Sequence, residues 1–574
     1  MTAVADRVVV LDGSTSPSRE VVGNKGRSIA RMLSLGLPVP PAFALPIDEC
    51  RRYHAAGGEL GDETWEAVLA GLRDLEERSG RRLGDPARPL LVSVRSSGAV
   101  SMPGMMDTVL NLGMTAEVEA ALARLSGDPE FAGSTHERFV EEFAHTVLGA
   151  DPDEPTPDVP SDPLDQLRAV VQTVFGSWSS RRAKAYRRHW GIPEDGGTAV
   201  IVQAMVFGNL GEDSGTGVLF TRDPLTGAAE PYGDWLPGGQ GEDVVSGTHD
   251  PLPLGALREQ LPDAHDRLIE AGRLLEREHG DVQDVEFTVE RGSLYLLQTR
   301  VAKRSPHAAV RTAVDFAEEG AIDRREAVRR VSAEQLARVL APRLPEDAAE
   351  SAEVVARGTP ACPGVASGLA VGDSDAAEAE PGDVVLVRPT TSPEDVSGMI
   401  AARGVVTEHG GSTSHAAVVT RALGRPSVVG VGDGLAAELA GRELTVDGTA
   451  GVVYAGRLPT EEVEPGAVPG LTELLAWAEE LCPVTVADSA PELVDLDAEG
   501  LGVEGDETPD RAALTERLRG ATAARGSVLA TAEGARAVLA AGVPAVVRLP
   551  GQPAAALLLR LVQEMSDVEE GRNQ

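Results

Sequence analysis

The chain has 574 residues, and at about 100–200 residues per domain this length predicts three or four domains. Hydrophobic residues make up 42% and charged residues 25%, which favours packed globular domains over disorder. The formal net charge of −38 disfavours binding to nucleic-acid backbones or anionic membrane surfaces, because these carry charge of the same sign. An anionic substrate would therefore need a local cluster of cationic side chains.

The cysteines and the N-terminal sequence point to a cytoplasmic protein. Cys50, Cys362 and Cys482 lie far apart and form no CxxC pair, so neither a zinc knuckle nor a disulfide framework is predicted. The N-terminal residues contain only a short apolar run, unlike a secretory signal, and no stretch reaches the roughly 18 apolar residues that a membrane span needs. We expect no membrane and no nucleic-acid partner.

Residues 1–342 alternate helix-like and strand-like segments, as expected for an α/β domain. Helices are predicted over 62–79, 134–148 and 164–190. Buried strands are predicted over 90–94, 199–206, 285–289 and 294–298. The last two strands flank Arg291-Gly292, which reads as a hairpin turn, and the acidic, proline-dense segment 150–163 reads as an exposed insertion.

The second half of the chain contains two linkers and two further domains. Charged linkers are predicted at 343–357 and 457–470, and between them a β-rich domain with one helix near Thr413 occupies 358–456. The tail, 471–574, reads as a βα array. Its strands are predicted over 484–488, 500–504, 527–531 and 545–549, and its helices over 513–520, 534–542 and 554–563. About 100 residues cannot close an eight-stranded βα barrel alone.

The strongest chemical motif is the segment TEHGGSTSHAA, residues 407–417. A strand runs into a double-glycine turn, then hydroxyl side chains, then a helix. Free N–H groups at a helix start favour an anion, glycines let a phosphate approach the backbone, and Thr413 and Ser414 can cap the helix. His415 in this setting can attack phosphorus as a nucleophile. The simpler alternative, a histidine that only caps the helix, is disfavoured by the surrounding pattern.

Two segments near the N-terminus suit a polyphosphate. In RSSGAVSMPGMMDT, residues 95–108, a buried strand delivers Arg95 to a loop of small residues that includes Gly104. Backbone amides together with an arginine bind phosphate oxygens well. Lys25 lies in the turn GNKG and is one of only three lysines in the chain, which favours a specific role over a general surface charge. The alternative for the first segment is a methionine-rich packing loop.

A predicted hairpin carries a set of ligand atoms for magnesium. Asp284 and Glu286 lie two residues apart on one strand, so both side chains point to the same face of the sheet. Gln298 and Arg300 have the same spacing on the next strand. Oxygen ligands on adjacent strands suit Mg²⁺, and Arg300 can stabilise a transferring group. The alternative is an exposed hairpin with cross-strand charges. Upstream, a glycine turn that contains Gly215 and Gly217 leads into a strand, although ordinary turns have similar sequences.

Neither a dinucleotide loop, a Walker-type phosphate loop nor a zinc site is predicted. The run Gly430–Gly434 lacks the full GxGxxG of a dinucleotide loop, and the chain has no GxxxxGK[ST] motif. His409 and His415 are not expected to bind zinc, because no third ligand is near them in the sequence.

At the His415 motif the chain resembles the pyruvate phosphate dikinase family of phosphoenolpyruvate-utilising phosphotransferases. The segments CPGVASG (362–368), TSPEDVSGM (391–399), SMPGMMDT (101–108) and GLPVPPAF (36–43) resemble it too. The resemblance implies an α/β and α+β multidomain fold: an ATP-grasp domain over 1–342, a swivelling phosphohistidine domain over 358–456, and over 471–574 a short βα remnant of the pyruvate/phosphoenolpyruvate barrel. It covers roughly residues 20–455 and then fades.

The resemblance also implies an ATP-dependent phosphotransferase in which His415 carries the phosphoryl group and Arg300 assists catalysis. The residues implied to bind ATP are Lys25, Arg95, Gly104, Gln203, Gly215, Gly217, Asp284 and Arg300. Glu286 and Gln298 are implied to hold Mg²⁺, and Thr413 matches a regulatory phosphorylation position. ATP and inorganic phosphate are the implied substrates, with pyruvate, phosphoenolpyruvate or a separate acceptor-domain protein as the acceptor. The oligomeric state stays open.

Two departures from the family leave alternatives. The chain has Ala99 and His409 where the family commonly has arginines, and both changes remove a permanent positive charge near the phosphate path. They favour a non-catalytic relative that senses nucleotide or docks a partner. A third hypothesis, transfer to a small molecule as in antibiotic-inactivating relatives, is weaker because those relatives carry a large acceptor domain where this chain has a short linker.

Overall fold

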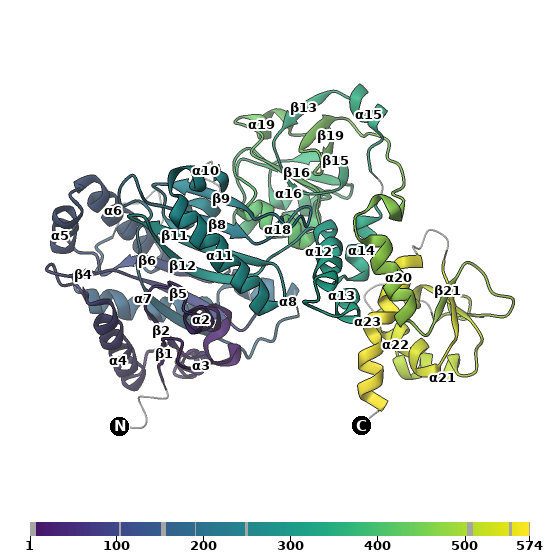
Figure 1. The fold of residues 1–574 in the computed structure, drawn as a ribbon, viewed down its shortest axis with the longest axis horizontal. Coiled ribbons are helices and arrows are strands. Elements are labelled where there is room, and N and C mark those ends of the chain that lie inside the picture. Colours follow the sequence, from purple (N-terminus) through teal and green to yellow (C-terminus); the bar gives the residue numbers. More distant parts are fainter. Residues whose placement is uncertain are drawn as a thin grey trace.

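The computed structural model of the chain describes residues 7–100, 102, 105–150, 157–189, 191–246, 251–341, 343–501, 509–549 and 554–572. These residues form a mixed α/β fold with five sheets. The N-terminal region contains two five-stranded sheets, and a sheet of eight strands forms a separate region. Figure 1 shows these regions and a C-terminal region, with a group of helices between them. No helix in the described part of the chain combines the length and apolar character needed to cross a membrane.

The first sheet of the N-terminal region is antiparallel, with strand order β1-β2-β7-β5-β6. Its strands are β1 (Val9–Leu11), β2 (Ala42–Leu45), β5 (Val92–Gly98), β6 (Thr108–Leu112) and β7 (Thr198–Ala204), and β3 (Arg82–Leu83) pairs separately with β4 (Pro89–Leu90). The helices are α2 (Arg19–Ser34), α3 (Ile47–Ala55), α4 (Asp62–Ser79), α5 (Ala116–Ser126), α6 (Pro129–Thr146), α7 (Pro163–Ser177) and α8 (Arg181–His189). Val94 of β5 and Val202 of β7 pair across the sheet and pack into the core beside α6 and α7.

The second sheet is also antiparallel, with order β10-β9-β8-β11-β12. Its elements are β8 (Gly215–Phe220), β9 (Tyr232–Pro237), α9 (Gly241–Ser246), β10 (Leu252–Pro253), α10 (Gly255–Gln260), α11 (Pro262–His279), β11 (Gln283–Glu290) and β12 (Ser293–Val301). One face buries Leu219, Val285 and Phe287 against α11. The hairpin predicted at Arg291-Gly292 is present, and both residues have positive φ, 48° and 73°, as a two-residue hairpin turn requires.

The eight-stranded region has the order β13-β20-β19-β15-β16-β17-β18-β14. Its elements are β13 (Val354–Arg357), β14 (Thr359–Cys362), β15 (Val365–Val371), α16 (Ser374–Ala379), β16 (Val384–Arg388), η1 (Pro393–Asp395), α17 (Val396–Ala401), β17 (Gly404–Thr407), α18 (His415–Leu423), β18 (Ser427–Val429), α19 (Leu435–Leu439), β19 (Glu443–Asp447) and β20 (Val452–Ala455). Strands β15 to β18 are parallel. Residues 354–357 were predicted as linker, but they pair with β20 and extend this sheet.

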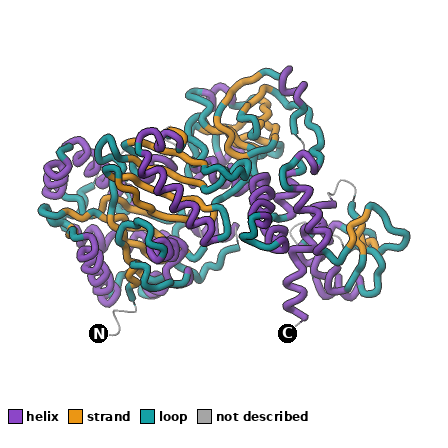
Figure 2. Tube along the Cα trace, viewed as in Figure 1, coloured by secondary structure: helices purple, strands orange, loops and turns teal. Residues whose placement is uncertain are grey.

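Five helices pack together between the three regions, and we call them the helical hub. They are α12 (Pro306–Glu318), α13 (Arg324–Arg330), α14 (Ala333–Val339), α20 (Leu471–Leu481) and α23 (Ala554–Arg572). Val314, Leu336, Leu474 and Leu559 share one hydrophobic core, so segments on both sides of the eight-stranded region meet there. Figure 2 shows these helices side by side next to the strands of the C-terminal region.

The two segments that connect the hub to the eight-stranded region contact each other. They contain α15 (Glu346–Ser351) and η2 (Pro465–Ala467). Arg343 and Glu461 exchange two backbone hydrogen bonds, of 2.8 and 2.7 Å, and the Arg343 Nε donates to Glu461 Oε1 at 2.9 Å. The chain therefore enters and leaves the eight-stranded region at one place.

The C-terminal region has a four-stranded parallel sheet, β21-β24-β23-β22, and one predicted strand of this region is not formed. Its elements are β21 (Thr485–Ala487), β22 (Val494–Asp495), α21 (Arg511–Leu518), β23 (Ala524–Arg525), η3 (Ser527–Ala530), α22 (Ala532–Ala541) and β24 (Ala545–Val547). Residues 527–531 form a 3₁₀ turn rather than a strand, because Thr531 caps α22 and Gly526 turns the chain directly before it. The predicted strand 500–504 lies mostly outside the described residues.

Helix predictions in the N-terminal region were mostly right. Helix α4 has the predicted bounds, whereas the helix predicted over 164–190 is broken into α7 and α8 near Trp178. The guanidinium of Arg187 lies 4.1 Å from the ring centroid of Trp178, and its Nη1 donates to the Trp178 carbonyl at 2.7 Å. This contact folds α8 back towards the end of α7.

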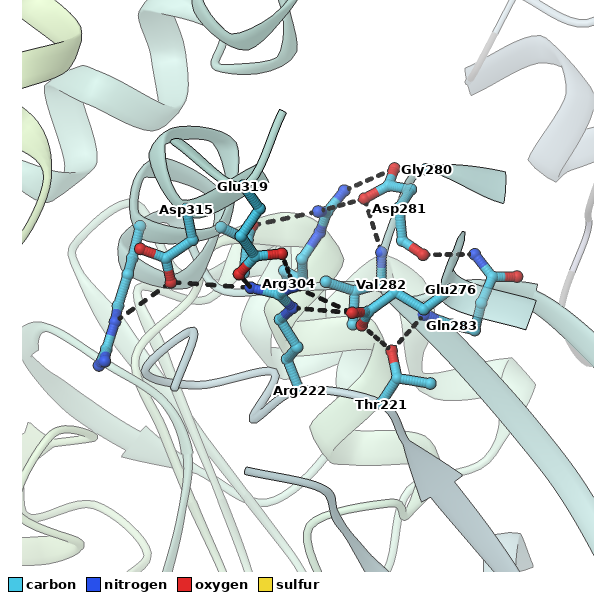
Figure 3. Close-up of polar contacts among 12 residues, drawn as sticks. Thr221, Arg222, Glu276, Gly280, Asp281, Val282, Gln283, Arg304, Asp315 and Glu319 are labelled. Carbon is cyan, nitrogen blue, oxygen red and sulfur yellow. Dashed lines mark hydrogen bonds and ion pairs between the residues drawn. The ribbon is translucent and has the colours of Figure 1, made fainter. Parts of the chain in front are cut away.

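A buried arginine fastens the hub to the second sheet (Figure 3). Arg222, at the end of β8, is 5% exposed and binds Glu276 of α11 at 2.9 Å and Glu319, directly after α12, at 2.7 Å. Its guanidinium also lies 4.1 Å from the ring centroid of Phe316. Strand, covering helix and hub are thus held by one side chain, because its five N–H donors can serve several acceptors.

Candidate functional site

The candidate site begins with a row of side chains across the second sheet. In register, Asp234 of β9 pairs with Val218 of β8, Val218 with Glu286 of β11, and Glu286 with Gln298 of β12. Directly paired residues point to the same face of a sheet. Asp234, Glu286 and Gln298 therefore lie on one face, opposite the face that packs on α11.

A cation–carboxylate contact joins this face to the first sheet. Arg95 of β5 donates from Nη2 to Glu286 Oε2 at 3.3 Å, and both side chains are largely buried. Burial opposes ionisation of Glu286, but the charges of Arg95, Arg300 and Lys25 outweigh it and lower the pKa of this carboxyl. Three predicted cations thus act on one predicted metal ligand, and the carboxylate stays charged.

Asp284 and Gln298 carry buried oxygens without partners. Asp284 is 2% exposed, and its Oδ2 accepts from Arg300 Nε at 2.8 Å. Among the described residues, neither its Oδ1 nor the Oε1 of Gln298 has a hydrogen-bond partner. Burial raises the pKa of Asp284, against the charge of Arg300, whereas Asp284 raises the pKa of Arg300. Unsatisfied buried oxygens beside a charged carboxylate are a donor set that fits a hard cation such as Mg²⁺.

Lys25 is positioned by a close approach of α2 to β5. Gly23 has a φ of 69° inside α2, and a Cβ atom there would lie 2.0 Å from the carbonyl oxygen of Ser97, so only glycine fits. The Ser97 hydroxyl donates to the carbonyl of Val22 and accepts from the N–H of Lys25 at 3.1 Å. The turn containing Lys25 is thereby fixed beside the strand that carries Arg95.

The other residues predicted to contact the nucleotide have different surroundings. Gln203 of β7 lies in register with Ser93 and donates to the Pro40 carbonyl at 3.2 Å. Gly215 and Gly217 lie within β8 rather than in a turn, and added Cβ atoms would meet the rings of Trp235 and Phe287 at 2.2 and 2.5 Å. These two glycines are therefore needed for packing. Gly104 lies outside the described residues.

His415 is the first residue of α18, as predicted. The Ser414 hydroxyl caps the helix by accepting from the N–H of Ala417 at 3.4 Å. The imidazole Nδ1 lies 3.1 Å from the Thr391 hydroxyl, and the part of the chain that the structure describes offers no hydrogen-bond partner to the buried Nε2. Burial lowers the pKa of His415, against the charges of Asp395 and Glu394, so the ring is neutral near pH 7. A neutral ring leaves one nitrogen with a free lone pair.

The loop before His415 is docked on the second sheet at Asp234. The Asp234 carboxylate accepts from the Ser412 hydroxyl at 3.1 Å, the Thr413 N–H at 3.2 Å and the Thr413 hydroxyl at 2.7 Å. Further along α18, the Arg421 guanidinium lies 5.6 Å from the ring centroid of Phe220, on the same face of the sheet. Two strand spacings of about 4.8 Å separate Asp234 from Glu286.

Sequence reasoning missed Asp234 and Thr391. Asp234 is a buried acid in an otherwise apolar strand, and an acidic residue at an inward-facing position is a signal for a partner. Thr391 lies in the segment TSPEDVSGM, which resembles the family but had no role assigned.

Comparisons with known proteins show which families and proteins the chain is similar to. Residues 58–253 match the family model "Pyruvate phosphate dikinase, AMP/ATP-binding domain", and residues 380–451 match "PEP-utilising enzyme, mobile domain". Pyruvate, phosphate dikinase 2 of Zea mays is 41% identical over 545 residues, covering 85% of this chain and 61% of the relative. Pyruvate, phosphate dikinase of Clostridium symbiosum is 38% identical over 559 residues, covering 88% and 64%.

The chain thus spans less than two thirds of the length of these relatives. The match nevertheless extends over most of the chain, and it includes both the region that carries Arg95 and the region that carries His415. The chain is thus similar to the pyruvate, phosphate dikinases over most of its own length.

Proposed function

We propose that the chain is an ATP-dependent phosphotransferase in which His415 takes a phosphoryl group from a nucleotide bound between the two N-terminal sheets. In this proposal the N-terminal region is an ATP-grasp domain and the eight-stranded region is a swivelling phosphohistidine domain. The observation that carries the proposal is the row Asp234–Val218–Glu286–Gln298, because it aligns the contact of the His415 loop with the cation–carboxylate cluster on one sheet face.

The nucleotide phosphates would lie where the cationic side chains converge. Lys25, Arg95 and Arg300 supply the positive charge that an overall acidic chain otherwise lacks. Glu286 and Gln298, with the free Oδ1 of Asp284, would hold Mg²⁺. Bound there, the ion would bridge nucleotide phosphates and neutralise part of their charge.

The proposed transfer is an in-line displacement at phosphorus. Nε2 of His415 attacks the β-phosphorus of ATP, an N–P bond forms, and the bond between that phosphorus and its oxygen to the α-phosphate breaks, which releases AMP. Inorganic phosphate then takes the outer phosphoryl group as pyrophosphate and leaves phosphohistidine. Nδ1–H donating to the Thr391 hydroxyl keeps the lone pair on Nε2.

Pyruvate is the proposed final acceptor, since the relatives are named for it. The paired segments at Arg343 and Glu461 are the proposed hinge for moving His415 away from the nucleotide. Pyruvate-dependent AMP release, assayed with the chain alone and with a cell extract, tests whether a separate polypeptide completes this step.

Labelling with β-³²P-ATP tests the proposed function. With magnesium and phosphate present, the protein should gain an acid-labile, base-stable label that His415→Ala abolishes. His136→Ala is the matched control, because that imidazole pairs with Glu119 and lies away from α18. Failure of the unaltered chain to label, or labelling that survives His415→Ala, would contradict the proposal.

A second candidate function is a non-catalytic nucleotide sensor. The observation that favours it is His409, which occupies a position where the family commonly has an arginine. The side chain lies beside Glu408 and Asp433. Tight nucleotide binding without AMP formation would support this function over the first.

A further inference from the structure

A second cluster of polar side chains lies at the edge of the eight-stranded sheet. Glu408 and His409 directly follow β17, and Asp433 follows β18. These strands are parallel neighbours, and Thr407 pairs with Val429 at their carboxyl ends. Loops at the carboxyl ends of adjacent parallel strands converge, so the fold brings together residues that are separated in the sequence.

The three side chains are close enough to share one ion. Nε2 of His409 lies 2.9 Å from Oδ1 of Asp433, and one ligand atom from each of the three residues lies within 4.8 Å of the others. Glu408 is only 8% exposed, and its Oε1 accepts from the N–H of Ala436 at 2.7 Å. Among the described residues its second oxygen has no hydrogen-bond partner. A carboxylate oxygen that accepts no hydrogen bond from the protein can be satisfied by a cation or by solvent.

These side chains line a pocket of about 370 Å³. Glycine backbone, Thr359 and Pro251 complete its wall, and none of the lining residues is a lysine or an arginine. The acidic side chains in the lining are those of Glu408 and Asp433. Such a pocket repels phosphate and attracts a divalent cation.

We propose that Glu408, His409 and Asp433 bind one divalent transition-metal ion of the Zn²⁺ class. An imidazole combined with carboxylates suits Zn²⁺, Co²⁺ or Mn²⁺, whereas Mg²⁺ prefers oxygen ligands alone. Three protein ligands leave a further coordination position open towards the pocket. The sequence argument against zinc at His409 considered only residues near it in the chain, whereas the fold brings Asp433 to His409 from the loop after the neighbouring strand.

This site is distinct in chemistry from the proposed nucleotide site. Glu286, Gln298 and Asp284 offer only oxygen atoms and lie on the second sheet of the N-terminal region. The metal bound at His409 would instead tie the loop after β17 to the loop after β18. The two sites can therefore be separated by substitution.

Binding of Co²⁺ to the full chain, stripped of metal with a chelator and free of nucleotide, tests the proposal. Visible absorption reports imidazole-bound Co²⁺ and its coordination number. One equivalent should give a band whose affinity falls about tenfold or more in His409→Ala and in Asp433→Asn. Both residues are well exposed, at 41% and 85%, so these variants should keep the fold, which circular dichroism checks.

Two controls make the result specific. His265→Ala removes a similar histidine–carboxylate pair, with Asp266 at 3.1 Å, which has no third ligand described, and should leave the band unchanged. Glu286→Gln should also leave the band unchanged. Three outcomes would each overturn the proposal: a band that persists in His409→Ala, a band lost only in Glu286→Gln, or no band in the unaltered chain. None of these outcomes bears on the labelling of His415.

Discussion

Replacing Asp234 with alanine should release the His415 loop from the second sheet. The carboxylate accepts three hydrogen bonds, from the Ser412 hydroxyl and from the N–H and hydroxyl of Thr413. The side chain is 8% exposed, so its removal leaves these donors without partners in a buried interface. The contact between the two regions should then weaken while each region keeps its own core.

The expected loss follows from the number and kind of these bonds. A hydrogen bond to a charged group contributes about 1.5–3 kcal/mol, and removing one partner of a buried charged contact costs about 2–5 kcal/mol. Burial raises the pKa of Asp234 despite the hydrogen bonds, so part of the gain is already offset by desolvation. We therefore expect a loss of about 3 kcal/mol, or roughly 100-fold in the docking equilibrium.

Small-angle scattering and labelling with β-³²P-ATP measure the two consequences. The Asp234→Ala chain should have a larger radius of gyration, and its initial labelling rate should fall while nucleotide affinity stays the same. Asp383→Ala is the matched control, because that carboxylate binds Arg403 and Arg457 within the eight-stranded region and its edge. Unchanged scattering and unchanged labelling in Asp234→Ala would refute the reasoning.

Further predictions concern the labelling of His415 and the stability of the fold. Thr391→Val should slow labelling of His415 by about 2- to 10-fold, the value of one hydrogen bond, without changing nucleotide affinity in equilibrium binding. Burial holds the pKa of His415 below its ordinary 6.5, so the labelling rate should be constant above pH 6.5. The rate should fall only at lower pH, where protonation removes the attacking lone pair. A pH–rate profile whose decline is centred above pH 6.5 would contradict this expectation. Arg222→Ala should lower the free energy of unfolding by about 3–5 kcal/mol in chemical denaturation, because it strands the Glu276 carboxylate. Arg311→Ala, which removes a half-exposed contact of 3.7 Å, should cost less than about 1 kcal/mol.

Local patterns in the sequence were sufficient for the hairpin that carries the proposed metal ligands. The hairpin lies within 17 residues of chain, from 284 to 300. It contains two pairs of side chains at i, i+2 spacing, Asp284 with Glu286 and Gln298 with Arg300, and the turn at Arg291-Gly292 between them. Strand period and turn chemistry act over that range, so the facing of these side chains could be read directly. The helix start at His415 was predictable for the same reason.

Contacts between distant segments could not be read in this way. Asp433 joins Glu408 and His409 only because β17 and β18 are adjacent in the sheet, and Asp234 meets Thr413 only because two regions dock. The strand predicted over 527–531 was also wrong. These residues have the composition of a strand, but the cap of the following helix sets their conformation. Tertiary context overrides local propensity at such places.

The paired segments at Arg343 and Glu461 have a consequence for how this architecture can be rearranged. Since the chain departs from the hub and returns to it at a single point, the eight-stranded region is topologically an insertion into a helical bundle. The bundle core formed by Val314, Leu336, Leu474 and Leu559 does not depend on any residue of the inserted strands. A short glycine bridge from 341 to 463 should therefore excise the insertion and leave a bundle that still folds, and related cassettes could be exchanged at the same junction.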